Sequence, residues 1–292
     1  MTRDPRYGIV DGEELYRKLA MGEPVVVLDV RTGTEHAARH IPGSLLIPLH
    51  ELQSRVGEIP NSGTPVAVLS EKGIRSESAC KLLAEHAFMP VLNLEGGLQS
   101  WAGPTANGDS NHSRHWFGIG PSDFLVQQFD LLPKGIALDL AMGDGRNAIY
   151  LATRGFDVDG VDVSQDAVNA ARASSRQLGA PIRALVGNVE DGSYIIPEEA
   201  YDVIMVFNFL HRPLFKEIRD GVKPGGAVIY ETFTIDQPRF GPPKNPDYLL
   251  KPGELREAFS GWEILIYHET VDPERPGSRR RARAGIVARK PD

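Results

Sequence analysis

The stretches ALDLAMGDGRNA, Ala137–Ala148, and FDVDGVDVS, Phe156–Ser164, decide the fold of this chain. An apolar strand runs into a loop with Gly143 and Gly145, a helix follows at once, and a second strand ends at Asp162. Glycines let a ligand approach the backbone, a helix N-terminus offers N–H groups, and a carboxylate at the next strand end can accept from ribose hydroxyls. The pattern predicts a nucleotide pocket in a doubly wound α/β sheet.

Asp139 helps to decide which nucleotide this pocket takes. Gly143, Gly145 and Ala148 also satisfy the loose dinucleotide fingerprint, so the glycines by themselves discriminate little. A carboxylate four residues before the first glycine would oppose a pyrophosphate, whereas it would attract a cationic ligand. The arrangement D-x-x-x-G-x-G followed by a ribose-binding Asp resembles class I S-adenosylmethionine-dependent methyltransferases, whose cofactor carries an ammonium and a sulfonium but no phosphate.

Further motifs extend this resemblance along the chain. Tyr201–Val206 matches the fourth strand of that fold, Lys223–Gly226 the turn before the fifth, and Val228–Phe233 the fifth strand. Gly143–Asp162 is most similar to the tellurite-resistance type of small-molecule methyltransferase, although Ala141–Met142 replaces the Gly–Cys pair usual there. The resemblance implies S-adenosylmethionine as cofactor and a small-molecule substrate, with a thiol or a chalcogen oxyanion as candidate acceptors.

The end of the chain matches the last two strands of the same fold. WEILIYHETV, residues 262–271, and AGIVARK, residues 284–290, are predicted to form the antiparallel end of a seven-stranded, doubly wound Rossmann-like sheet. The join between them carries the arginine-rich run Arg279–Arg283. We interpret this run as a solvated turn or an ion-pairing surface, with a nucleic-acid contact or an approach to acidic groups of the N-terminal domain as alternatives.

Residues that follow the parallel strands are expected to line the cofactor pocket, because ligands of doubly wound sheets bind at the carboxyl ends of the strands. The resemblance assigns the methionine part to the first loop, the ribose to Asp162 and the adenine to residues 163 and 188–189. The expected cofactor-binding residues are Asp139, Gly143, Asp144, Gly145, Asp162, Val163, Asn188, Val189 and Phe207.

The stretch Phe207–Pro213 follows the fourth strand, where the transferable methyl group is expected. His211 is the candidate base or substrate ligand, with a structural role left equally open, and Asn208 is the second candidate catalytic residue. A Pro-rich stretch, residues 234–259, is predicted to act as a lid. The candidate substrate contacts are Arg212, Tyr230, Arg239 and Tyr248. A surface role is the alternative for Arg212, and no metal site is expected.

Length and composition are those of a globular chain with two domains. The chain has 292 residues, a net charge of −7 and a polar Gly- and Ser-containing stretch at residues 103–115. We therefore predict a domain over residues 1–104, a linker over 105–114 and a second domain over 115–292. The acidic charge disfavours nucleic acid as a partner. We find no apolar run near the roughly 20 residues of a membrane span and no signal peptide, so the cytoplasm is the expected location.

The N-terminal domain has its own set of motifs. Apolar strands are predicted at Val25–Arg31 and Pro65–Leu69, and the second runs into the loop Ser70–Ser76 and then a helix. HIPGS at His40–Ser44 and LEGGLQSW at Leu94–Trp101 complete the pattern. These features resemble the rhodanese domain over nearly the whole N-terminal domain.

Ser70 is the main departure from the rhodanese pattern. In rhodaneses this loop opens with the cysteine that carries a persulfide, and a serine hydroxyl neither ionises readily nor accepts sulfane sulfur. Cys80, the single cysteine, is interpreted as a small buried hydrophobe. We therefore expect no sulfurtransferase activity. Gly73 and Arg75 stand where they could still hold an oxyanion, and a retained scaffold for a protein partner is the alternative.

Together these patterns predict an S-adenosylmethionine-dependent small-molecule methyltransferase with an inactive rhodanese-like domain in a binding or regulatory role. Two other hypotheses belong to different classes. One is a cofactor- and anion-binding sensor or scaffold without turnover. The other is a methyltransferase of tRNA or protein, which would require Arg279–Arg283 and the pocket mouth to form one continuous basic face.

Overall fold

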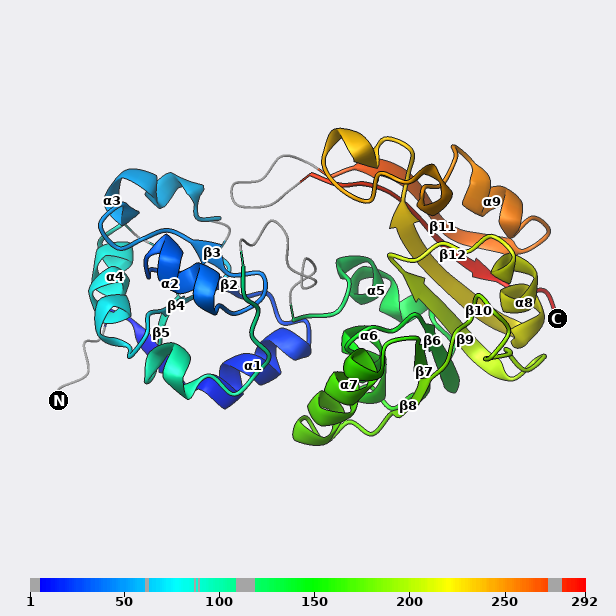
Figure 1. Cartoon of the computed structure of the whole chain (residues 1–292), viewed down its shortest axis with the longest axis horizontal. Helices are drawn as coiled ribbons and strands as arrows, with labels where there is room; N and C mark the ends of the chain where they lie inside the picture. The colour runs from blue at the N-terminus through cyan, green and yellow to red at the C-terminus, as the bar shows by residue number, and fades with distance from the viewer. Residues whose placement is uncertain (1–5, 61–62, 87, 89, 109–118, 273–279) are drawn as a thin grey trace. The chain divides into compact units, whose positions relative to one another are not determined.

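The computed structural model describes the chain except for residues 1–5, 61–62, 87, 89, 109–118 and 273–279 (Figure 1). It divides into two compact units, one within residues 1–120 and the other within residues 121–292. The predicted linker, residues 105–114, falls partly outside the described residues. At its start, Ala106 exchanges backbone hydrogen bonds of 2.8 and 2.9 Å with His40, so this part of the chain is attached to the first unit.

The first unit is built on a parallel sheet with the strand order β1-β5-β4-β2-β3 among the described residues. Its strands are β1 (Gly8–Val10), β2 (Val26–Asp29), β3 (Leu45–Leu46), β4 (Val66–Leu69) and β5 (Val91–Leu94). Its helical segments are α1 (Gly12–Ala20), α2 (Gly33–Ala38), α3 (Leu52–Arg55), η1 (Val56–Glu58), α4 (Ile74–Glu85) and η2 (Gly97–Ser100).

Local sequence signals account for these elements. Every residue of β4 is buried, as expected for an apolar central strand of a parallel sheet. The carboxylate of Asp11 caps α1 by accepting from the Glu14 amide at 2.7 Å. Thr32 and Glu35 form a reciprocal capping box at the start of α2. The helix predicted after the loop Ser70–Ser76 begins inside that loop, at Ile74, and extends to Glu85.

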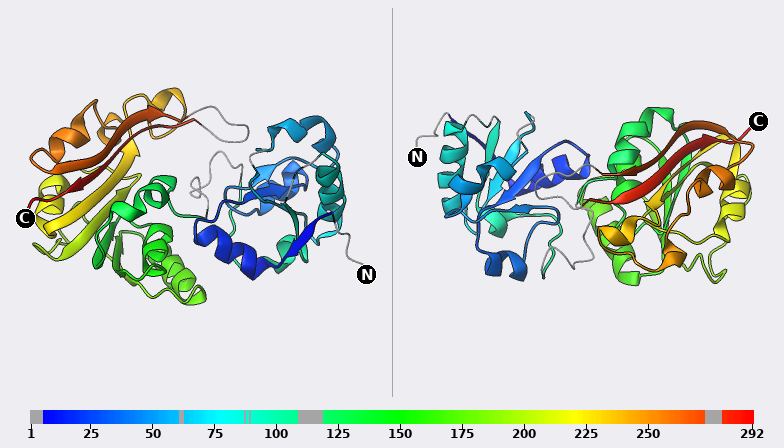
Figure 2. Two further views of the ribbon diagram at one scale, coloured as in Figure 1. Left: turned by 180° about the vertical axis from the view of Figure 1, so that it is seen from behind. Right: turned by 90° about the horizontal axis from the view of Figure 1, so that it is seen from above.

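The second unit is built on a mixed sheet with the order β11-β12-β10-β9-β6-β7-β8 among the described residues (Figure 2). Its strands are β6 (Ile136–Leu140), β7 (Asp157–Asp162), β8 (Arg183–Val186), β9 (Tyr201–Phe207), β10 (Val222–Phe233), β11 (Glu263–Val271) and β12 (Ala282–Arg289). Its helical segments are α5 (Asp123–Gln128), η3 (Phe129–Leu131), α6 (Arg146–Ala152), α7 (Gln165–Gln177), α8 (Leu214–Gly221), η4 (Gln237–Arg239), η5 (Pro246–Tyr248) and α9 (Glu254–Ala258).

The pairing directions confirm the predicted fold class. Strands β6 to β10 run parallel, whereas β12 is antiparallel to β10 and β11 is antiparallel to β12. The first unit is a parallel α/β sheet and the second is a doubly wound sheet with an antiparallel end. In the described part of the chain, no helix combines the length and apolarity that crossing a membrane requires.

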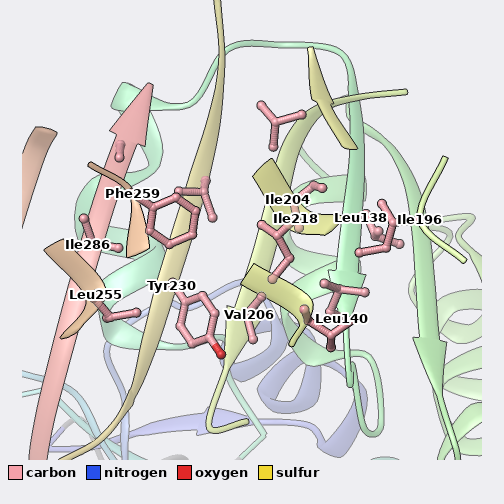
Figure 3. Close-up of a cluster of buried hydrophobic side chains, with 14 of the residues drawn as sticks. Leu138, Leu140, Ile196, Ile204, Val206, Ile218, Tyr230, Leu255, Phe259 and Ile286 are labelled. Carbon is pink, nitrogen blue, oxygen red and sulfur yellow. The ribbon is translucent and has the colours of Figure 1, made fainter. Parts of the chain in front are cut away.

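Side chains of the central strand β9 alternate between two apolar layers. Val203, Met205 and Phe207 pack with residues of α5 and α6. Ile204 and Val206 pack on the other face with residues of α8 and α9, in the cluster that Figure 3 shows. Because burial of one such side chain contributes about 1.5–3 kcal/mol, both layers strongly favour this register.

The predicted turn at Lys223–Gly226 lies inside β10 in the structure. β10 pairs with β9 at Val222 and again from Ala227, with a shift of register between them. Pro224 has no N–H to donate and Gly225 has a φ of +70°, so the strand bulges and continues.

The arginine run Arg279–Arg283 is only partly a turn. Arg279 lies outside the described residues, while Arg283 lies in β12, opposite Phe233 of β10. The Arg283 side chain is only 16% exposed and pairs with Glu231 and Asp272. The prediction of a solvated turn is therefore wrong for Arg283, because a buried carboxylate holds its guanidinium, and the ion-pairing alternative describes it.

Candidate functional site

The loop between β6 and α6 contains three residues in the left-handed region. Ala141, Gly143 and Gly145 have φ values of +53°, +59° and +78°. A Cβ on Gly145 would lie 2.8 Å from the Cβ of Ala171 in α7, so close packing requires glycine there. A Cβ on Gly143 would meet no atom within 4 Å, so this glycine leaves open space beside the backbone. Ala141 adopts the conformation without glycine, at a cost of about 1–2 kcal/mol.

Asp162 joins this loop to the end of β7. One carboxylate oxygen accepts from the Gly143 amide at 2.9 Å, and the other accepts from the Ser164 amide at 2.8 Å. An ionised carboxylate can accept about four hydrogen bonds, so acceptor capacity remains for two more donors. Two neighbouring ribose hydroxyls match that capacity. The open space at Gly143 and the acceptors of Asp162 therefore fit the ribose end of S-adenosylmethionine.

Asp139 lies in β6 beneath the same loop. Its side chain is buried and accepts from the Ala148 amide of α6 at 3.1 Å. Burial raises the pKa of Asp139 to about 8, against the opposing effect of the Ala148 hydrogen bond. The carboxyl group thus anchors α6 to β6, and its predicted interaction with a cationic cofactor stays a prediction.

The expected adenine contacts follow β7 and β8. Val163 is 67% exposed, which is unusual for a valine next to a buried strand and leaves an apolar surface for a flat ring. The Asn188 amide oxygen accepts from Glu190 N at 2.8 Å, and its amide nitrogen donates to Asp191 at 3.0 Å. Asn188 therefore shapes its own turn, and Val189 packs against the apolar core.

The loop after β9 carries the candidate catalytic residues. Asn208 has a φ of +56°, and its main-chain N–H donates to the Glu231 carbonyl at 2.9 Å. His211 is half-buried, and among the described residues none forms a hydrogen bond with its ring. Tyr230 is buried and donates its hydroxyl to the Phe209 carbonyl at 2.9 Å. Tyr230 thus supports this loop from the core, and the substrate contact predicted for it stays a prediction.

The other predicted substrate contacts lie on or beside the 234–253 segment. The Arg212 guanidinium is bonded to Glu254 and to main-chain carbonyls of this segment. Arg239 is largely exposed and pairs with Asp236 at 3.4 Å. Tyr248 is 53% exposed. Their contacts with a substrate stay predictions, as does the role of residues 234–259 as a lid.

A buried polar network at the same edge of the sheet was not predicted. Glu231 of β10 accepts from Arg283 at 2.7 Å and from the Ser122 hydroxyl at 3.4 Å, and His268 lies 3.6 Å away. Burial raises the pKa of Glu231, with Arg283 opposing the shift. Burial, reinforced by Arg283, lowers the pKa of His268. The signal in the sequence was a carboxylate inside the apolar strand VIYETF.

The structure therefore brings some of the predicted site residues together at the carboxyl ends of neighbouring strands. Gly143 and Asp162 are in direct contact, and Asp139 lies beneath the same loop. Asn208 and Glu231 are joined through their main chains on the next strands. Among the described residues, we find no group of three or more His, Cys, Asp or Glu side chains that could hold a metal ion.

In the first unit, the hydroxyl of Ser70 lies at the centre of the loop after β4. Its oxygen accepts from the amides of Gly73 at 3.2 Å and Ser76 at 3.3 Å, and the Ser76 hydroxyl lies 3.2 Å away. Ser70 is 1% exposed. Gly97 supports the loop closely, because a Cβ there would lie 2.3 Å from the Ser70 carbonyl oxygen. The amides of Gly73 and Ser76 thus converge on the centre of this loop, where the Ser70 hydroxyl oxygen accepts from both.

The charges around this loop are paired within the unit. Arg75 donates to both carboxylate oxygens of Glu35, at 2.9 and 2.5 Å, and this lowers the pKa of Glu35 to about 2. Glu71 accepts from the buried Arg31 at 3.1 Å. Cys80 is buried, and burial raises the pKa of its thiol to about 12, so it is an unreactive core residue.

Comparisons with known proteins match each unit separately. Residues 11–104 match the rhodanese-like domain, and residues 137–226 match a methyltransferase domain. A sulfurtransferase of Allochromatium vinosum is 39% identical over 93 residues, which is 32% of this chain and 86% of that protein. A putative sulfur carrier protein, YrkF, of Bacillus subtilis is 33% identical over 93 residues, 32% of this chain, and the match covers only 50% of its length.

A longer match is to a protein named as a methyltransferase. A protein of Haemophilus influenzae named probable S-adenosyl-L-methionine-dependent methyltransferase TehB is 26% identical over 213 residues, covering 65% of this chain and 72% of that protein. The crystal structure of TehB from Haemophilus influenzae superimposes with a TM-score of 0.49 at 23% identity, over 57% of this chain and 61% of that one. Through residues 11–104 and the match to the Allochromatium vinosum protein, the chain belongs to the rhodanese-like family. Its C-terminal domain is an S-adenosylmethionine-dependent methyltransferase domain.

Proposed function

We propose that the chain transfers the methyl group of S-adenosylmethionine to a small acceptor whose nucleophile is a sulfur, selenium or tellurium lone pair. The main support for binding of this cofactor is the hydrogen bond from the Gly143 amide to Asp162, next to the open space at Gly143. When bound, the cofactor supplies an electrophilic methyl group on a sulfonium. The resemblance of Gly143–Asp162 to the tellurite-resistance type of methyltransferase supports the choice of a chalcogen acceptor.

The polar groups at the acceptor side also favour a nucleophile that needs no strong base. Glu231 is the buried carboxylate nearest the end of β10, and Arg283 holds it in an ion pair. Burial keeps His268 mostly neutral, because its pKa is lowered. His211 can orient an acceptor through its ring. An in-line displacement by a lone pair then depends chiefly on alignment and on exclusion of water.

We infer that the rhodanese-like domain has a binding or regulatory role without sulfur transfer. Ser70 stands at the centre of the loop in place of a nucleophilic thiol, and its oxygen already accepts from two amides. Cys80 is buried in the core and cannot substitute for it. A protein or an oxyanion is the class of partner for this domain.

Mass spectrometry of an acceptor screen tests the methyltransferase proposal. Purified protein is incubated with deuterium-labelled S-adenosylmethionine and with tellurite, selenite or a small thiol, and methylated products are sought. We expect a labelled product with at least one chalcogen acceptor. Tight binding of S-adenosylhomocysteine without product from any acceptor would favour a sensor without turnover.

Replacement of His211 by Ala separates orientation from base catalysis. We expect the variant to bind S-adenosylhomocysteine as the wild type does and to turn over a chalcogen acceptor more slowly. The loss should stay below the roughly 10²–10⁴-fold that removal of a general base causes, because a lone-pair nucleophile gives up no proton. Loss of the folded state in this variant would instead assign His211 a structural role.

A further inference from the structure

Arg212 connects two segments that both lie at the carboxyl end of β10 and its neighbour β9. It belongs to the 208–213 loop that follows β9 and carries Asn208 and His211. Its guanidinium reaches the 234–253 segment and the first residue of α9, Glu254. Arg212 is the only arginine among residues 208–213.

The guanidinium is bonded through all three nitrogens. Nε donates to one oxygen of Glu254 at 2.5 Å, and Nη2 donates to the other at 3.0 Å. Nη1 donates to the Asp247 carbonyl and Nη2 to the Leu249 carbonyl, each at 2.8 Å. Such a two-pronged, charge-assisted arrangement is geometrically specific and is not reproduced by lysine.

Glu254 is held in place from a second direction. One of its oxygens also accepts from the Lys251 amide at 2.8 Å, and its side chain is only 17% exposed. Burial by itself would raise the pKa of Glu254, but the hydrogen bonds from Arg212 and Lys251 outweigh burial and lower it. The pair therefore stays ionised at neutral pH.

The 208–213 loop is fixed to the core on its other side. The Tyr230 hydroxyl donates to the Phe209 carbonyl, and the Asn208 amide donates to the Glu231 carbonyl, both at 2.9 Å. The 234–253 segment also folds back on its own beginning, since Ile235 and Leu250 are joined by a backbone hydrogen bond of 3.0 Å. Arg212 thus links two segments whose conformations are each also supported by other hydrogen bonds.

Resting on the proposed function, we propose that Arg212 is a positioning residue. Its ion pair with Glu254 orients the guanidinium, and its bonds to the Asp247 and Leu249 carbonyls couple the 234–253 segment to the loop that carries Asn208 and His211. The coupling fixes the acceptor side of the methyl-transfer site. Its guanidinium contacts the segment and not the acceptor. The sequence left a substrate contact and a surface role open for Arg212, and in this proposal its guanidinium acts through the segment.

Hydrogen exchange followed by mass spectrometry tests the coupling without any substrate. We compare full-length wild type with Arg212→Met, Glu254→Gln and the double variant. Each single variant should speed exchange about tenfold in both the 208–213 and 246–250 peptides. The double variant should add little more, because both changes remove the same pair. Faster exchange confined to residues 246–250 would overturn the proposal, since it would mean local support without coupling.

Arg219→Met is the matched control. Arg219 of α8 also donates to carbonyls beside α9, those of Ala258 at 2.8 Å and Ser260 at 3.1 Å, but it is not part of the 208–213 loop. We expect it to leave exchange in the 208–213 peptide unchanged. If Arg212→Met does not fold, Glu254→Gln and Arg212→Lys carry the comparison, with Lys restoring part of the protection.

A kinetic measurement separates positioning from general stability. With selenite as the probe acceptor, Arg212→Met should raise KM about tenfold or more while the Kd of S-adenosylhomocysteine stays within about twofold. Equal losses in both quantities would contradict a positioning role. If the wild type methylates no probe, the proposed function fails, whereas the exchange experiment still decides whether Arg212 couples the two segments.

Discussion

Both units carry a buried parallel strand into a helix through a loop that ends at a left-handed glycine, Gly73 in one and Gly145 in the other. The centres of the two loops differ. In the rhodanese-like unit, the hydroxyl of Ser70 fills the space where the amides converge. In the methyltransferase unit, Gly143 leaves open space and a carboxylate from the neighbouring strand, Asp162, lies beside it. The same strand–loop–helix turn thus has its converging amides occupied by a side chain in one unit and open space beside its glycine in the other.

Removal of the Asp162 carboxylate should have the largest effect on the open loop. Asp162→Ala leaves the amides of Gly143 and Ser164 and the ribose hydroxyls without their acceptor, so S-adenosylhomocysteine should bind more weakly by about 1–3 kcal/mol. Isothermal titration calorimetry measures the change. Asp202→Ala is the control, because Asp202 accepts from Ile136 N at the start of β6 and should affect stability only. Unchanged affinity in Asp162→Ala, or tight NAD binding by the wild type, would contradict the assignment of the pocket.

The two glycines of the open loop should separate folding from binding. Gly145→Ala brings a Cβ to 2.8 Å from Ala171 at a φ of +78°, so we expect a loss of about 2 kcal/mol in unfolding free energy. Gly143→Ala meets no neighbour, so it should cost only about 1 kcal/mol from its φ of +59° but should weaken cofactor binding by occupying the open space. Denaturant unfolding and calorimetry on both variants check this. Equal cofactor affinity in wild type and Gly143→Ala would mean that the ligand does not approach there.

The sequence could predict the fold because its signals are local. Buried strands and glycine loops depend on neighbours in sequence, and the strands predicted before the two loops are confirmed as β4 and β6. The polar network at the sheet edge could not be predicted in this way. Glu231 and Arg283 are 52 residues apart, and only the antiparallel pairing of β10 with β12 brings them together. Likewise, nothing near Arg212 in sequence indicates that Glu254 is its partner.

Acidification should weaken the ion pair of Glu35 with Arg75, beside the Ser70–Ser76 loop, and this effect on stability should be smaller than those above. The pKa of Glu35 is lowered from its ordinary value of 4.5 to about 2, mainly by the Arg75 hydrogen bond. A lowered pKa means that the stabilisation is fully present above about pH 4.5 and is lost as the pH falls toward 2. Both side chains are about a third exposed, so we expect less than about 1 kcal/mol. Unfolding curves of Arg75→Met and wild type should differ at pH 6 and converge near pH 2.

The smallest change in stability is expected from Ser70→Cys, which replaces one side-chain atom at the centre of the closed loop. A thiolate there would accept from the same amides of Gly73 and Ser76, at the N-terminus of the 12-residue helix α4. These donors and the helix dipole favour the anion. The wild type has a hydroxyl and no thiol at this position, so we expect it to show no thiosulfate-to-cyanide sulfur transfer. The Ser70→Cys variant should take sulfane sulfur from thiosulfate as a persulfide, releasing sulfite.

The nearby charges oppose each other in this variant. Glu71 places a carboxylate beside the loop, but Arg31 holds it at 3.1 Å, and Glu35 similarly holds Arg75. The amides, and not a free cation, must then stabilise the persulfide, so the expected activity is low but detectable. Mass spectrometry of the protein after thiosulfate treatment reads the added sulfur directly. Sulfur transfer by the wild type would mean that Ser70 does not occupy the nucleophile position. A Ser70→Cys protein that folds but gains no sulfur would mean that converging amides at this loop are insufficient, and that the two loops differ in more than what fills their centres.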